Sequence, residues 1–198
     1  MQIALSRSRS LLHVAKGILR FAVLPAALFV GAFYSNMVLT TNFHPVIAGE
    51  VYRSSQPSAN DIAEFKKRYG IRTIINLRGD NSGHDWYDKE VAQAKELGIN
   101  HIDFKMSADR ELTQAQAAEL VDIMREAPKP LLIHCQAGAD RTGLASALYL
   151  AAIAKVDESV SEKQISILYG HISLSVSHAY AMDRTFEKLE PWLGFSDS

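Results

Sequence analysis

The residues with the clearest capacity for chemistry are a cysteine and an arginine separated by five residues, Cys135 and Arg141. They lie in the segment HCQAGADRTG (134–143). A thiolate is a strong nucleophile, and a guanidinium can hold two oxygens of a tetrahedral oxyanion such as phosphate. The apolar run LLIHC (131–135) precedes this loop, and the apolar stretch RTGLASALYLAAIAK (141–155) follows it. This order predicts a buried strand, a tight loop and a central helix.

A loop that enters a helix presents free backbone N–H groups and the positive end of the helix dipole. Gly138 is expected to let the loop curl tightly, and Gly143 to let the start of the helix pack closely on the sheet. The predicted phosphate-binding loop consists of Gln136, Ala137, Gly138, Ala139, Asp140 and Arg141. Its positive field favours the thiolate form of Cys135, and a thiolate beside bound phosphate can attack phosphorus in line.

Alternating strands and helices are expected to position this loop. Strands are expected within VIAGEVYRSSQPS (46–58), IRTIINLR (71–78), NHIDFKM (100–106) and LLIHC (131–135). Helices are expected at 60–69, 86–98, 113–127 and 141–155, and near 158–170 and 175–192. The alternation predicts an α/β domain with a mainly parallel central sheet flanked by helices.

The segment HCQAGADRTG resembles the signature loop of the cysteine-based protein tyrosine phosphatase superfamily, in its dual-specificity branch. The segments VYRSSQPS, IRTIINLR and LYGHIS also resemble bacterial and atypical members of this branch. The resemblance implies that Cys135 forms a phosphocysteine intermediate and that Arg141 stabilises the transferred phosphoryl group. It implies that Thr142 places its hydroxyl near the cysteine sulfur and that His134 orders the loop from behind. It implies neither a cofactor nor a metal.

The superfamily also implies an aspartate that protonates the leaving oxygen and then activates water. Asp109, in the loop SADRE (107–111) and 26 residues before Cys135, is the preferred candidate because a loop residue can reach over bound phosphate. Asp103, on the preceding predicted strand, is the second candidate. Asp80 and Asp85 are weaker alternatives.

Asp140 departs from the commonest loop pattern, because a carboxylate beside the phosphate repels it unless the carboxylate is paired. The sequence Asp-Arg-Thr-Gly resembles loops of bacterial and lipid-active members, including phosphoinositide phosphatases. Many of these carry loop lysines where this chain has Gln136 and Ala139, which disfavours a polyphosphorylated headgroup. Asp140 is expected to shape the loop, to bind water or to serve as an alternative proton donor.

The sequence indicates the roles of four further residues less clearly. Arg53 and Arg78 are each expected either to line the mouth of the pocket or to form a surface ion pair. His171 and His178 are expected to be capping or surface residues rather than metal ligands, because no carboxylate cluster accompanies them.

The N-terminal part of the chain contains an uncharged run of 19 residues (21–39), which is long enough to span a bilayer core. The four basic residues that precede it are Arg7, Arg9, Lys16 and Arg20. We therefore expect a basic segment (1–17), a transmembrane anchor (18–40) and a phosphatase domain (41–198). A cleaved signal peptide is the alternative, although no small-x-small cleavage site is evident.

Orientation and compartment follow from the distribution of charge. The first 40 residues carry four positive charges, and the remaining 158 carry a net charge of −5, so the total is −1. The positive-inside rule places the N-terminus in the cytoplasm, as for a single-pass protein of a bacterial inner membrane. The near-neutral total argues against nucleic-acid binding, and one cysteine excludes an intramolecular disulfide.

The expected function is that of a membrane-anchored phosphomonoester hydrolase, with a phosphorylated protein as substrate. A phospholipid-headgroup phosphatase, of phosphoinositide or phosphatidylglycerophosphate type, is the first alternative. A catalytically silent phosphate-binding module is the second. A sulfurtransferase or an arsenate reductase also uses a cysteine anion loop, but arsenate reductase is disfavoured by the late loop and by the lack of a resolving cysteine.

Overall fold

The computed structural model describes residues 19–195 of the chain. The chain divides into two compact units, Met1–Thr40 and Thr41–Ser198. The assignment of an anchor to residues 18–40 and of a phosphatase domain to residues 41–198 stays a prediction. The predicted basic segment 1–17 lies outside the described residues.

The described part of the first unit is helical. The π-helical turn η1 (Leu19–Val23) continues into helix α2 (Leu24–Leu39), with a proline in the first turn of α2. Over Arg20–Leu39 the mean hydropathy is 1.7, and none of these side chains is buried. By length and composition, this helix is able to cross a membrane.

The second unit is built on a five-stranded sheet in the order β1-β2-β5-β3-β4. Its strands are β1 (His44–Ile47), β2 (Val51–Ser54), β3 (Thr73–Asn76), β4 (Asn100–Asp103) and β5 (Leu131–His134). Strand β1 pairs antiparallel with β2, whereas the other three pairs are parallel. The prediction of a mainly parallel α/β sheet is therefore confirmed.

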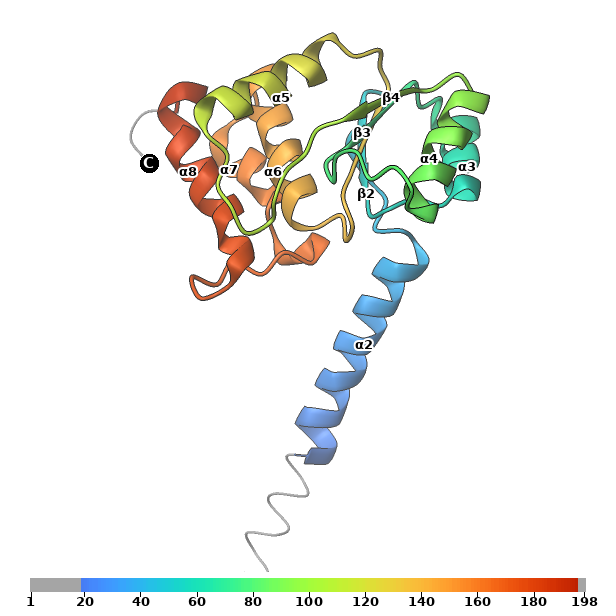
Figure 1. Ribbon diagram of the computed structural model, residues 1–198. Helices are drawn as coiled ribbons and strands as arrows, with labels where there is room; N and C mark the ends of the chain where they lie inside the picture. Colours follow the sequence, from blue (N-terminus) through green and yellow to red (C-terminus); the bar gives the residue numbers. More distant parts are fainter. Residues whose placement is uncertain (1–18, 196–198) are drawn as a thin grey trace, which may run out of the picture. The chain divides into compact units, whose positions relative to one another are not determined.

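Helices cover both faces of this sheet, with α3 and α4 on one face and α5, α6 and α8 on the other (Figure 1). The main helices are α3 (Ala59–Tyr69), α4 (Asp85–Glu96), α5 (Gln114–Glu126), α6 (Asp140–Leu148) and α8 (Ala181–Leu193). Successive residues of β5 point to opposite faces, so Leu132 packs under α3 and α4 while Leu131 and Ile133 pack under the other helices.

Local sequence explains where the first helices begin and end. The hydroxyl of Ser58 accepts a hydrogen bond from the amide of Asp61, whose carboxylate in turn bonds the amide of Ser58. Thr113 and Gln116 form the same reciprocal cap at α5. Gly70 ends α3 with φ +69°, a left-handed conformation that suits glycine.

The C-terminal prediction was partly wrong. The helix expected near 158–170 is replaced by a single turn, α7 (Glu158–Ser161), and the 3₁₀ turns η3 (Glu162–Gln164) and η4 (Ile167–Tyr169). A continuous helix would keep the carbonyl of Gln164 inside its ladder, whereas here that carbonyl accepts a hydrogen bond from Arg53 at 2.7 Å. The interaction with a distant arginine therefore outweighs local helix formation.

Two other predicted helices differ in detail. The helix expected over 141–155 consists of α6 and the π-helical turn η2 (Tyr149–Ile153), and it is central as predicted, with residues 142–152 all buried. The helix expected over 175–192 begins later. It is preceded by the 3₁₀ turn η5 (His178–Tyr180), and α8 starts at Ala181.

The parallel pairing brings polar residues together at one edge of the sheet. Ser54, Asn76 and His134 lie in register across β2, β3 and β5, and Asp103 is paired with Asn76 on β4. These are the carboxyl ends of the parallel strands, where open α/β sheets bind ligands. Cys135 follows His134 directly, so the predicted loop leaves the sheet at this edge.

Candidate active site

The loop after β5 turns its carbonyl groups away from the site. The carbonyl of Gln136 accepts from the amide of Gln56 at 3.2 Å, and that of Ala137 accepts from Nδ2 of Asn42 at 3.1 Å. The carbonyls of Gly138 and Ala139 both accept from Arg53. Across a trans peptide, a carbonyl and the next amide point in opposite directions. The amides of residues 137–140 therefore point toward the face where an anion can bind.

Gly138 and Gly143 are needed for this conformation. Gly138 has φ +71°, and a Cβ there would lie 2.6–2.7 Å from backbone atoms of Ser54 and Ser55. A Cβ on Gly143 would lie 2.8 Å from the carbonyl oxygen of Gln164. Gly143 thus allows a close approach as predicted, but to the η3 segment rather than to the sheet.

Arg53 supports the loop from behind, contrary to both predictions for this residue. Its side chain is fully buried, with Nη1 donating to the carbonyl and the side-chain oxygen of Gln164 and Nη2 donating to Gly138. Its guanidinium lies 3.8 Å from the ring centre of Tyr169. Burial lowers the pKa of Arg53 to about 10, which leaves it charged at neutral pH. Arg53 therefore fixes the loop but does not line the pocket mouth.

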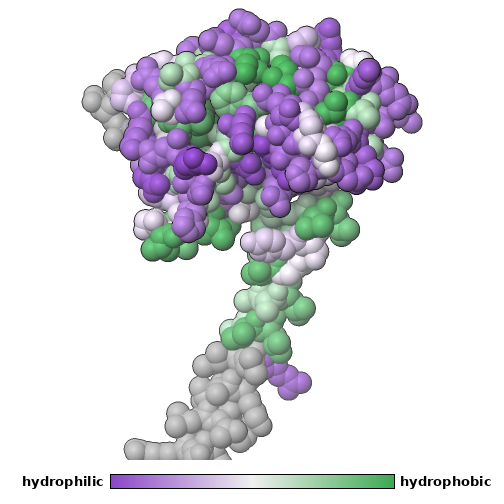
Figure 2. All heavy atoms as spheres, in the orientation of Figure 1, coloured by the Kyte–Doolittle hydropathy of each residue, from purple (hydrophilic) through white to green (hydrophobic). Residues whose placement is uncertain are grey.

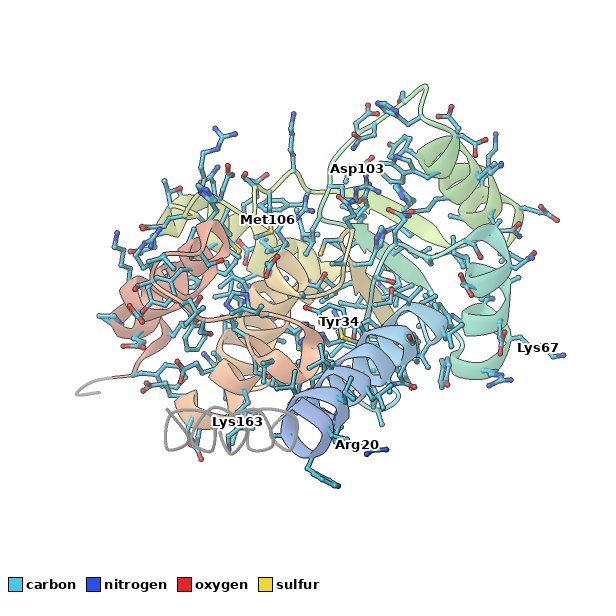
Figure 3. The ribbon with its side chains drawn as sticks, turned by 90° about the horizontal axis from the view of Figure 1, so that it is seen from below. Arg20, Tyr34, Lys67, Asp103, Met106 and Lys163 are labelled. Carbon is cyan, nitrogen blue, oxygen red and sulfur yellow. The ribbon has the colours of Figure 1, made fainter. Side chains whose placement is uncertain are left out.

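Arg141 and Asp109 line one hollow in front of the loop, with a volume of about 610 Å³. Nη1 of Arg141 donates to the carbonyl of Met106 at 3.4 Å, and Figure 3 labels Met106 on the segment that follows β4. Nε of Arg141 is buried and has no hydrogen-bond partner within residues 19–195, so it is able to bind a phosphate oxygen. The structure thus brings two of the three predicted catalytic residues together.

Cys135 and Thr142 are both buried at the base of the loop. The hydroxyl of Thr142 makes no hydrogen bond to any residue that the structure describes. The predicted position of this hydroxyl near the cysteine sulfur stays a prediction.

The alternative acids have other partners. Asp103 accepts hydrogen bonds from the hydroxyl of Tyr87 and from Nδ2 of Asn76, at 2.5 and 2.8 Å. Asp80 binds Ser82, and Asp85 pairs with a lysine one turn later. These contacts give each of the three carboxylates a structural role. Asp109 stays the preferred candidate because it lines the same hollow as Arg141.

Asp109 is exposed, and its carboxylate lies 4.0 Å from Nε of Arg110. A hydrogen bond from Ser107 lowers the pKa of Asp109. A phosphate dianion bound nearby would raise that pKa, because like charges disfavour the ionised form. Substrate binding itself is therefore expected to prepare Asp109 for proton donation.

We expect Asp109→Asn to reduce turnover of a phosphotyrosine peptide by about 100-fold or more, because general acid catalysis contributes on this scale. The loss should be much smaller with an activated aryl phosphate, whose leaving group needs no proton. Steady-state rates with the two substrates measure the difference. Asp103→Asn is the matched control, and a substrate-dependent loss in that variant instead would show that Asp103 is the acid.

His134 is held by a buried carboxylate that the sequence analysis missed. Oε1 of Glu90 lies 2.8 Å from Nε2 of His134 and 2.8 Å from Nε2 of His101, and Gln56 donates to Oε2. Burial opposes ionisation of Glu90, but the charge of His134 and the hydrogen bonds outweigh it and lower the pKa to about 2. His134 is thus fixed behind the loop, as the resemblance implies.

The spacing of Glu90 along its helix nevertheless contains a signal that it is buried. The buried residues of α4 are Tyr87, Glu90 and Ala94, spaced as one face of a helix. A carboxylate on that apolar face predicts a buried partner. Arg78 belongs to the same surroundings, because it donates to Oε1 of Gln56 and stacks 3.5 Å from the ring centre of Trp86.

Asp140 is paired, as its position beside the phosphate requires. Oδ1 of Asp140 lies 2.7 Å from Nδ1 of His171, and Oδ2 of Asp183 on α8 lies 2.8 Å from Nε2 of the same ring. His171 is buried, so its prediction as a capping or surface residue was wrong. His178 is exposed as predicted and lines the hollow with Asp109. The pairing supports the expectation that Asp140 shapes the loop.

The His171 link makes stability depend on pH. Burial disfavours the charged ring, but the bonds and charges of Asp140 and Asp183 outweigh it and raise the pKa of His171. The stabilisation is therefore complete below the pKa of the unfolded state, about 6.5, and is lost as pH rises through the folded pKa.

We expect His171→Gln to lower the free energy of unfolding by about 2 kcal/mol near pH 6 and by less as the pH rises above 7. Urea unfolding of residues 41–198 at several pH values measures this loss. His178→Gln, in the same segment but exposed, is the control. An equal loss at every pH would mean that His171 is not charged in the fold.

The fold and the site together define a class. In a mainly parallel α/β sheet, strand β5 is followed by an amide-lined loop and then by the buried helix α6. A cysteine stands at the start of this loop, and an arginine follows it six positions later. This is the arrangement of the cysteine-based phosphatases. The chain belongs to the tyrosine phosphatase family, whose model matches residues 37–163. It is a cysteine-dependent phosphatase of the tyrosine phosphatase type.

Solved structures with the same fold include three proteins of low sequence identity. TpbA of P. aeruginosa is 21% identical over 78% of this chain and 92% of its own, with a TM-score of 0.60. SIW14 of S. cerevisiae, described as a PP-IP phosphatase, is 18% identical over 79% and 94%, with a TM-score of 0.55. PTPMT1 in complex with PI(5)P is 16% identical over 76% and 97%, with a TM-score of 0.57. TpbA has also been solved in complex with phosphotyrosine. No curated protein matches the chain.

Proposed function

We propose that this chain is a membrane-anchored phosphomonoester hydrolase that acts through a phosphocysteine intermediate on Cys135. The observation that carries the proposal is the loop whose four carbonyls, at residues 136–139, are all bonded from behind. That arrangement turns the amides of residues 137–140 toward the face where an anion can bind, in the loop that joins Cys135 to Arg141. Such preorganised donors stabilise charge without reorganising during the reaction.

The proposed reaction has two steps. The Cys135 thiolate attacks phosphorus, the bond from phosphorus to the ester oxygen breaks, and Asp109 gives that oxygen its proton. The Asp109 carboxylate then takes a proton from water, and the resulting hydroxide displaces sulfur to release inorganic phosphate. Arg141 and the loop amides hold the three equatorial oxygens in both steps. His134 orders the loop from behind, and Thr142 places its hydroxyl near the cysteine sulfur.

We further propose that α2, within residues 18–40, anchors the phosphatase domain (41–198) to a membrane. Its support is an uncharged helix with no buried side chain. The basic residues before it favour a cytoplasmic N-terminus and a domain on the opposite side, as in a bacterial inner membrane. A reporter enzyme fused to the C-terminus tests this orientation, and reporter activity in the cytoplasm would contradict it.

The proposed substrate is a phosphorylated protein, which agrees with the phosphotyrosine complex of TpbA. A phospholipid headgroup is the second candidate, because an anchored site meets bilayer molecules at high local concentration. The PI(5)P complex of PTPMT1 supports that candidate. Neutral Gln136 and Ala139 favour a headgroup with a single phosphate.

Phosphate release by the purified full-length chain tests both candidates. A phosphotyrosine peptide and a panel of phospholipid monoesters in vesicles are compared at equal enzyme concentration, with Cys135→Ser as the blank. Preferential release from the peptide supports the protein substrate, and preferential release from vesicles supports the lipid. No release from any phosphomonoester would overturn the enzymatic proposal.

A further inference from the structure

A group of large aliphatic side chains is exposed on the segment between η3 and α8. Its members, with their exposed fractions, are Ile167 (66%), Leu168 (67%), Ile172 (44%), Leu174 (57%) and Val176 (89%). We call residues 167–176 the apolar loop. Figure 2 shows hydrophobic residues at the lower edge of the domain, where this part of the chain protrudes in Figure 1. Soluble proteins rarely leave such a cluster uncovered without an interaction to make.

The charge pattern of this segment is equally unusual. From residue 164 to residue 182 there is no aspartate, glutamate, lysine or arginine, although these types make up 22% of the chain. The only titratable side chains there, apart from tyrosines, are two histidines, and buried His171 faces the domain through Asp140 and Asp183. Insertion of the apolar loop into an apolar phase would therefore bury no charged side chain of its own.

The apolar loop also borders the mouth of the active site. Val176 and the following residues 177–179 line the same hollow as Arg141 and Asp109. A surface that covers the apolar loop therefore lies beside the opening through which a phosphomonoester must enter.

The short link between α2 and the domain indicates that this surface is a membrane. Helix α2 ends at Leu39, and β1 begins at His44. The five Cα-to-Cα steps from Leu39 to His44 reach at most about 18 Å, so a domain attached to a membrane-spanning α2 is held at the membrane surface. A bilayer is then always within reach of the domain, whereas a protein partner has to be recruited.

We propose that the apolar loop inserts into the interfacial region of the bilayer to which the chain is anchored, with the mouth of the active site directed at phosphomonoesters carried by that membrane. The inference rests on the proposed anchor but not on the proposed chemistry. The apolar loop would give the chain a second contact with the membrane besides α2. Apolar segments of this kind can lie in the interfacial region without crossing the bilayer. It also selects membrane-borne phosphate esters among the substrates that the loop can bind.

Labelling at single cysteines tests the insertion. The full-length chain carrying Cys135→Ser and Leu174→Cys is labelled with an environment-sensitive fluorophore and reconstituted into vesicles of neutral and anionic phospholipid. Lys67→Cys in the same background is the control, because Lys67 is exposed on α3 and points away from the domain (Figure 3). We expect the label at position 174, but not at 67, to shift to the blue and to be quenched by lipids with a nitroxide on the acyl chain.

Two outcomes overturn the proposal in different ways. If the chain floats with the vesicles but the two labels are quenched equally, the loop does not insert, and the anchor stands. If the chain does not float with the vesicles, both the anchor and the insertion are wrong. Neither outcome bears on phosphate release, which is measured separately.

Activity gives an independent test. The double variant Ile172→Ser and Leu174→Ser changes two exposed residues that do not line the hollow. We expect an unchanged rate with a soluble phosphotyrosine peptide and a loss of about tenfold with a phospholipid monoester in vesicles, since two apolar contacts with the bilayer are removed. A loss with the peptide and not with the vesicles would assign the loop to a protein partner instead.

Discussion

Replacing Cys135 with serine should reduce phosphate release by roughly 10⁴-fold or more while leaving phosphate binding intact. Losing the nucleophile of a covalent mechanism costs rates on this order. The loop amides and Arg141 do not depend on the sulfur atom, so the variant should still bind a phosphotyrosine peptide. Steady-state release and calorimetric binding, measured on the same preparation, separate the two effects.

Direct detection of the phosphocysteine intermediate tests the mechanism more specifically than the loss of turnover does. Acid quenching during turnover should leave the wild-type chain with one phosphoryl group on the peptide containing Cys135, as seen by mass spectrometry. Ser146→Ala, which changes a buried residue of helix α6 after the loop, should keep both the intermediate and the turnover. Appreciable turnover by Cys135→Ser would show that a different residue attacks phosphorus.

The second large effect is expected from Arg53→Met. The guanidinium of Arg53 donates to three carbonyls and to the side-chain oxygen of Gln164, all buried. Methionine fills similar space but leaves these acceptors unpaired, which should lower the free energy of unfolding by about 3–5 kcal/mol. Urea unfolding of residues 41–198 measures the change.

Activity should fall with stability in this variant, by about 100-fold, because small displacements of a preorganised site are costly. The loss should appear mainly in kcat, since Arg141 still provides a charge for binding. Arg72→Met, at an exposed position beside β3, is the matched control and should change the free energy of unfolding by about 0.5 kcal/mol or less. If Arg53→Met were equally mild, the loop would keep its shape without this support.

Much of the fold was predictable because its determinants are local. The buried strands at 71–78 and 131–135 are short apolar runs, and the caps at Ser58 and Thr113 are defined within four residues. The helix expected at 158–170 failed for a reason that no local pattern contains. The helix is interrupted there because the carbonyl of Gln164 accepts a hydrogen bond from Arg53, which lies 111 residues earlier.

The same distinction applies to the site. Cys135, Arg141 and the loop between them are contiguous, so their spacing alone predicts a phosphate cradle. The supports of that loop come from elsewhere in the chain, and Arg53, Glu90 and His171 were misjudged or missed. A single sequence does not show which distant residues pair with each other. It also does not distinguish an arginine that will be buried from one that will be exposed. Glu90 alone carried a clue, since it lies on the buried face of its helix.

The long-range bonds behind the loop have a consequence for how the protein is made. The hydrogen bonds that shape the loop join residues 85, 95 and 111 positions apart. Contacts of such sequence separation form late, because each must close a long stretch of chain first. Residues up to 164 must therefore have left the ribosome before the cradle can close. A chain truncated before residue 164 would carry the whole signature loop without the hydrogen bonds between Arg53 and Gln164 that support it.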